Sequence, residues 1–261
     1  MDNPDSKKKI IVGGVVAVLV AGAAALFFWP KSEEPPAVVA PATPPAAEPE
    51  ANFPVPPAKK DSEALPALEA SDSLLGDMFA SLFGADASQV LLVKSDVARH
   101  FVVTVDNLPR KKVAERLKPV KPIAGKFAVT GPEGSQTIAP ENSARYTSLV
   151  KLVDTVDTKA ISAAYFRVYP LLQQAYVDLG YPTGYFNNRM VEVIDHLLAT
   201  PTVQTPIQVV QPNVMFEYAD PQLEALSAGQ KAMIRLGAEN GAIVKKKLRE
   251  LRAAITAKGP G

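Results

Sequence analysis

The run from Ile10 to Trp29 contains no charged residue, and it constrains this chain more than any other segment. A helix of that length extends about 30 Å, which matches the hydrocarbon core of a bilayer. Trp29 ends the run with an amphipathic ring of the kind that is favoured at the headgroup level. We therefore predict a transmembrane helix at 10–29, with the lipid bilayer as its partner.

The flanks of this run predict its orientation. Three lysines at 7–9 precede it, and basic flanks stay on the cytoplasmic side of a membrane. We expect residues 1–9 to form a cytoplasmic tail and the chain after Trp29 to lie outside. A cleaved signal peptide with a cut within 21–25 is the alternative. The apolar residues 26–29 continue beyond such a cut, which favours an uncleaved signal anchor.

Residues 30–66 contain 11 of the 24 prolines and almost no large apolar side chain. Such a segment cannot bury enough surface to fold, and proline favours the extended polyproline II conformation. We predict a disordered, Pro-rich linker over 30–66 that acts as a tether, with a maximum reach of roughly 115 Å. The folded domain is then expected at 67–258.

Helical periodicity dominates residues 67–258, so the predicted fold class is mainly α, one compact helical domain with small β-hairpin additions. A kink, or two helices end to end, is expected at Pro170. The segment 101–105 also reads as a strand. The expected hairpins pair 127–130 with 136–138 and 207–210 with 214–218. The expected helices are 72–83, 94–108, 111–117, 142–153, 157–179, a helix capped by Asn187 or Asn188 that ends at Thr200, 220–236, and a last one from about 241 to 255.

Composition excludes several classes of chemistry. The chain has no cysteine, which excludes disulfides, cysteine zinc sites, iron–sulfur clusters and thiol nucleophiles. Two histidines cannot build a multi-histidine metal site, and no nucleotide-binding or hydrolase motif is present, so no metal and no cofactor is predicted. A net charge of +1 gives no general attraction to nucleic acid. Ser148 and Lys151 match S-x-x-K, but the partner motifs of that chemistry are missing.

One helix carries the candidate acid/base residues Glu192, Asp195 and His196. Glu192 and His196 are four residues apart and so face the same way, which permits an acid/base pair. A surface ion pair, or a histidine at the edge of the core, explains the same spacing.

The segment 180–189 combines two glycines with aromatic, amide and guanidinium groups. Aromatic faces beside such donors bind sugars, peptides or partner proteins. The candidate binding residues are Tyr181, Tyr185, Asn187, Asn188 and Arg189. A purely structural turn, in which the tyrosines cover the core and an asparagine caps the next helix, is the alternative.

Two basic clusters, at 110–126 and at 245–258, carry net charges of about +6 and +5. Outside the cell such clusters suit acidic proteins or anionic polymers, although a solvated helix face has the same composition.

Several blocks of this sequence together resemble a family of uncharacterised proteobacterial single-pass membrane proteins with a periplasmic domain of unknown function. The resemblance covers the chain from about residue 95 onward, and members often carry Asp where this chain has Asn188. It implies a bacterial inner-membrane location, with the N-terminus cytoplasmic and the C-terminal domain periplasmic, but no activity and no catalytic residue. The blocks are 169–176, 179–182, 185–189, 193–201 and 226–231.

The leading hypothesis is a non-enzymatic binding or scaffold module, whose partner is a periplasmic protein or an anionic envelope polymer. The alternative is binding or hydrolysis of cell-wall glycan or peptide, with Glu192 or Asp195 as the acid/base.

Overall fold

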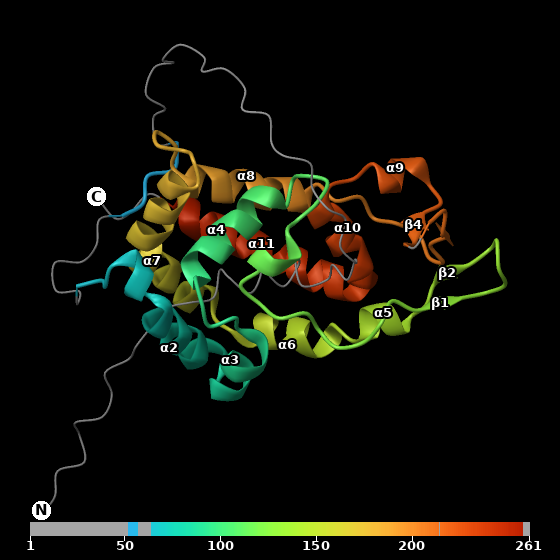
Figure 1. Ribbon diagram of the computed structural model, residues 1–261, viewed down its shortest axis with the longest axis horizontal. Coiled ribbons are helices and arrows are strands. Elements are labelled where there is room, and N and C mark those ends of the chain that lie inside the picture. Colours follow the sequence, from blue (N-terminus) through green and yellow to red (C-terminus); the bar gives the residue numbers. More distant parts are fainter. Residues whose placement is uncertain (1–51, 57–63, 214, 258–261) are drawn as a thin grey trace, which may run out of the picture.

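The computed structural model describes residues 52–56, 64–213 and 215–257 (Figure 1). The predicted membrane span at 10–29, the cytoplasmic tail and most of the predicted linker lie outside these residues. Within the described part of the chain, none of the helices is both long and apolar enough to cross a bilayer.

The described residues form a mainly helical domain with two small antiparallel sheets, as the sequence predicts. The sheets pair β1 (Val129–Thr130) with β2 (Thr137–Ile138) and β3 (Val209–Val210) with β4 (Glu217–Tyr218). Short 3-10 turns lie at Leu68–Ala70 and Glu115–Leu117. The α-helices are α2 (Asp72–Phe83), α3 (Ala85–Leu91), α4 (Val97–Asn107), α5 (Glu141–Ala144), α6 (Thr147–Thr155), α7 (Thr158–Asp178), α8 (Phe186–Leu198), α9 (Pro221–Glu224), α10 (Ala228–Arg235) and α11 (Gly237–Thr256).

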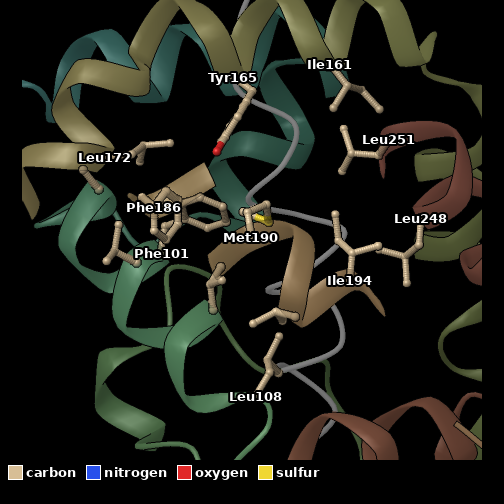
Figure 2. Close-up of a cluster of buried hydrophobic side chains, with 14 of the residues drawn as sticks. Phe101, Leu108, Ile161, Tyr165, Leu172, Phe186, Met190, Ile194, Leu248 and Leu251 are labelled. Carbon is tan, nitrogen blue, oxygen red and sulfur yellow. The ribbon is translucent and has the colours of Figure 1, made fainter. Parts of the chain in front are cut away.

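Helix α8 packs against α4, α7, α10 and α11, and in the view of Figure 1 it runs along the upper edge of the helical domain. Its apolar residues Phe186, Met190, Ile194 and Leu197 recur every three to four positions, so they share one face, and all four have no exposed surface. Figure 2 shows Phe186, Met190 and Ile194 among residues of α4, α7 and α11 in one core. The first turn of α8 is therefore held at a fixed place beside its neighbours.

The helix predicted at 94–108 is confirmed as α4, and its strand alternative at 101–105 is wrong, because Phe101, Val102 and Val105 fall on one buried helical face. Two other predictions differ from the structure. Helix α7 continues through Pro170, so two separate helices do not form there. The predicted helix 220–236 is two helices, because Ser227 starts α10 with a capping box to Gln230.

The remaining differences are smaller and concern helix ends, lengths and number. The predicted helix 142–153 is divided into α5 and α6, and only a 3-10 turn forms within 111–117. Helix α8 has Tyr185 at its N-cap rather than Asn187 or Asn188, and α11 begins at Gly237. Helix α3 was not predicted.

Part of the predicted linker lies against the domain. Phe53 packs on the core, and hydrogen bonds join its main chain to side chains of α8. The expectation that all of 30–66 is a free tether is therefore wrong for residues 52–56, which Figure 1 shows beside the N-terminal end of α8.

Candidate functional site

The turn between α7 and α8 is held in place by Gln173 of α7. Its amide Nε2 donates to the carbonyl of Gly184 at 2.7 Å, and its Oε1 accepts from the main-chain N–H of Phe186 at 2.9 Å. The hydroxyl of Tyr169 donates to the same Oε1 at 2.9 Å. Gln173 thus fixes the main chain on both sides of Tyr185. The Tyr185 side chain therefore extends from a backbone of defined conformation.

Aromatic rings cover the inner side of this turn. Tyr181 stacks on Tyr176 of α7, with ring centroids 4.4 Å apart and an interplanar angle of 13°. A Cβ atom at Gly184 would lie 2.9 Å from the Tyr176 ring, so this close packing requires glycine there. Tyr185, in contrast, is 41% exposed. One tyrosine therefore closes the turn and the other projects from it.

Asp106, at the end of α4, is the centre of the polar network beside the turn. Its side chain is only 4% exposed and accepts from Arg189 Nε at 2.9 Å and from Arg110 Nη2 at 2.7 Å. Tyr181 donates its hydroxyl to the same carboxylate at 3.2 Å, and Arg189 Nη2 also reaches the Asp106 carbonyl at 2.8 Å. This buried carboxylate fixes Arg189 and Tyr181 relative to each other.

The tyrosines of this network stay protonated at neutral pH. Burial, and secondly the charge of Asp106, raise the pKa of Tyr176 to about 12. The same two causes raise the pKa of Tyr181. Both hydroxyls are therefore neutral at pH 7, and that of Tyr181 donates to Asp106.

Asn187 is buried in this structure and is not part of the exposed surface of the turn. It has no exposed surface, accepts from the Tyr165 hydroxyl at 2.9 Å, and donates to the carbonyls of Phe53 and Ile255 at 2.9 and 3.2 Å. Asn188 accepts from the main-chain N–H of Phe53 at 3.1 Å. In this structure both amides therefore bind other residues of the same chain.

The three predicted acid/base residues each have a different partner. Glu192 forms an ion pair with Arg189 at 2.7 Å, and Asp195 accepts two hydrogen bonds from Arg252 of α11 at 2.5 and 2.8 Å. His196 Nε2 hydrogen bonds to Ser227 at 2.8 Å. Burial, and secondly the charge of Arg189, lower the pKa of His196. The side chains are thus directed to three different places instead of converging on one.

No metal site forms in the described part of the chain, where no group of three His, Cys, Asp or Glu side chains comes together.

Several members of the basic clusters have structural partners. Lys247 is 4% exposed and donates to the carbonyls of Val156 and Asp154 at 2.9 and 3.2 Å. Lys245 donates to the carbonyl of Thr200 at 2.6 Å, and Lys111 donates to that of Ala225. Lysines at helix and loop ends here satisfy backbone carbonyls, so the net charge of each cluster overstates what is available to a polymer.

Three residues that shape the site were not among the predicted candidates: Asp106, Gln173 and Phe53. An i,i+4 pairing of Asp106 with Arg110 was visible in the sequence as a signal for an ion pair. No local sequence pattern indicates the role of Gln173. Phe53 contacts α8 although more than 130 residues separate Phe53 from Asn188 in the sequence.

Comparison with known proteins identifies the family. A profile of the family described as Protein of unknown function (DUF3014) matches residues 97–252, and the chain belongs to this family. The matched range begins with α4 and includes Asp106, the α7–α8 turn and all of α8, whereas Phe53, α2 and α3 precede it. Searches of curated proteins and of solved structures found no significant match.

Proposed function

We propose that this protein is a non-enzymatic binding module that contacts another protein of the cell envelope through the Tyr185 face. The Tyr185 face comprises Tyr185 together with the neighbouring polar groups Arg110, Tyr181, Arg189 and Glu192. The observation that carries the proposal is the contrast at the turn: Gln173 fixes its backbone on both sides, while 41% of Tyr185 stays exposed.

A fixed, exposed tyrosine is well suited to bind a protein partner. Tyr, Trp and Arg dominate the energetically important positions of protein interfaces. An aromatic side chain has few rotatable bonds, and a backbone that is already ordered loses little further entropy on binding. Tyr185 therefore offers contact area at a low entropic cost.

The charges around the turn favour a protein over an anionic polymer. Arg110 and Glu192 are well exposed, with 56% and 65% of their side chains accessible, and they carry opposite signs. Arg189 is 17% exposed and is held by two carboxylates. A surface of mixed charge gives orientation and specificity to a complementary protein, whereas a polyanion would be repelled by Glu192.

The proposal includes a location, which rests on the sequence of the N-terminal residues. We propose that the run 10–29 anchors the chain in the inner membrane of a proteobacterium, with residues 1–9 in the cytoplasm and the helical domain in the periplasm. The apolar length of the run and the lysines at 7–9 support this arrangement. The module would then work within the reach of its tether from the membrane.

Photo-crosslinking in living cells tests the proposal. A photoreactive residue replaces Tyr185 in the full-length chain, and the same residue at Val90, which is 67% exposed in the distant helix α3, serves as the control. We expect discrete protein adducts from position 185 that are absent from position 90. Adducts that carry cell-wall fragments at 185 would contradict the protein-binding proposal and support the glycan or peptide alternative. No adduct at 185, with normal chain levels, would show that the turn is only structural.

A further inference from the structure

Phe53 is bound by α8 through its main chain as well as its ring. Its N–H donates to Asn188 Oδ1 at 3.1 Å, and its carbonyl accepts from Asn187 Nδ2 at 2.9 Å. Its ring packs on the hydrophobic core. Two consecutive amide side chains thus satisfy both main-chain groups of one residue, which is how a neighbouring strand would recognise an extended peptide.

We propose that Asn187, Asn188 and the core surface beneath the Phe53 ring form a binding site for an extended peptide with an aromatic residue followed by proline. Residues 52–56 fill this site in cis. The site is separate from the Tyr185 face, and its existence does not depend on what Tyr185 contacts.

The receiving side of this site is built independently of its occupant. Asn187 has no exposed surface, and its amide is oriented by two other partners: the Tyr165 hydroxyl at 2.9 Å and the Ile255 carbonyl at 3.2 Å. These contacts aim one Nδ2 hydrogen at the position of the Phe53 carbonyl. Asn187 is buried with the segment in place, so an occupant that lacks a carbonyl there would leave this covered donor without a partner, which is unfavourable. The site therefore favours an occupant with a carbonyl there.

The bound segment has the composition of a preformed ligand. Phe53-Pro54-Val55-Pro56 alternates with proline, which fixes φ and keeps the preceding residue extended. Such a segment is ordered at little entropic cost, as in other proline-rich ligands. Only Phe53 offers both a main-chain donor and a large ring within this segment. The two asparagines bind the main chain of Phe53, and the core surface contacts its ring.

Attachment in the same chain explains how a small contact is maintained. Residue 56 is joined to the domain at residue 64 by a short connection, and short connections give effective concentrations of about 1 mM. A partner peptide has to exceed this value or use additional contacts to displace the segment. Release would add the twelve positions 52–63 to the free tether, about 37 Å of extended reach, while Leu65 stays packed on the core. The site thereby sets the working length of the tether.

Hydrogen exchange of the full-length chain in mild detergent tests the cis contact. Pro54 and Pro56 carry no amide proton, so a proteolytic fragment around residue 53 reports on very few amides. We expect Phe53 to be protected, and Asn188→Leu to speed its exchange about tenfold. Asn188→Asp keeps an acceptor oxygen of the same shape and should leave the protection nearly unchanged. Exchange of Phe53 at the unprotected rate in the wild-type chain would overturn the proposal, as would equal loss in both variants.

Binding in trans tests whether the site recognises the peptide itself. In the full-length chain, Gly-Ser residues replace 52–56, and a fluorescent peptide copying residues 49–58 is added. We expect the peptide to bind this chain but not the wild-type chain, and binding to weaken about tenfold when the peptide's Phe is replaced by Ala. If the replaced chain has wild-type circular dichroism and binds no peptide at 1 mM, a concentration of about the effective value in cis, the site is not a peptide-binding site.

Discussion

Asp106→Asn is the substitution that tests the polar network most severely. The side chain of Asp106 is 4% exposed and accepts hydrogen bonds from Arg189, Arg110 and Tyr181. Asparagine has nearly the same shape, but it carries no charge. One of its two terminal groups is also a donor, which would face the N–H groups of an arginine. The substitution therefore removes the buried countercharge without creating a cavity.

The magnitude follows from the burial of each partner. Removing one member of a buried ion pair costs about 3–5 kcal/mol, because the other charge stays buried and uncompensated. Arg189 is 17% exposed but keeps Glu192, and Arg110 is 56% exposed, so water compensates part of the loss. We therefore expect Asp106→Asn to lower the free energy of unfolding by about 2–3 kcal/mol.

Urea denaturation of the full-length chain, followed by circular dichroism, measures this change. Asp195→Asn is the matched control, because Asp195 also binds an arginine but is 47% exposed. An exposed pair contributes at most about 1 kcal/mol, so the control should move the midpoint much less. Equal shifts for the two variants, or a change below about 0.5 kcal/mol for Asp106→Asn, would refute the reasoning from burial.

Three further predictions concern the residues around the turn. Asn187→Ala leaves buried partners at Tyr165, Phe53 and Ile255 without their hydrogen bonds and should lower the free energy of unfolding by about 2–4 kcal/mol in the same urea assay. Gly184→Ala places a Cβ 2.9 Å from the Tyr176 ring, so it should cost about 1–2 kcal/mol and change the near-ultraviolet circular dichroism of the stacked tyrosines; an unchanged spectrum would show that the stack is not tight. The pKa of His196 is lowered in the folded chain, so its contribution to stability is complete above the unfolded value of about 6.5 and decreases as the pH falls through and below it. The urea midpoint should therefore fall less between pH 7.5 and 5.5 in His196→Gln than in the wild-type chain, and equal slopes would contradict the shift.

Helices with a long apolar period could be predicted from the sequence, and their ends could be predicted where a local signal exists. The bounds of α2 agree with the prediction, and Asp157 caps α7 as its position suggested. The prediction missed the break before α10, although Ser227 and Gln230 have the spacing of a capping box. Helix α3 has a weak pattern of small and polar residues, so periodicity did not reveal it.

The candidate site was predictable in its position but not in the roles of its residues. The turn 180–189 was singled out from composition, and Tyr185 is exposed there. The roles of Asn187 and Asn188 depend on Phe53 and, for Asn187, on Ile255, which are distant in sequence, so no local pattern could assign them. Asp106 is buried beside Arg189 of α8, which is 83 residues away in the sequence, so no local pattern could predict this pair.

The affinity of the purified chain for the partner captured at position 185 tests the central claim most directly. Tyr185→Ser is compared with Val90→Ser, which also removes an exposed apolar side chain but lies in α3. If Tyr185 is a main contact, its loss should weaken binding at least about tenfold, and the Val90 variant should bind like the wild-type chain. Equal affinities for all three chains would contradict the claim that this protein binds its partner through the Tyr185 face.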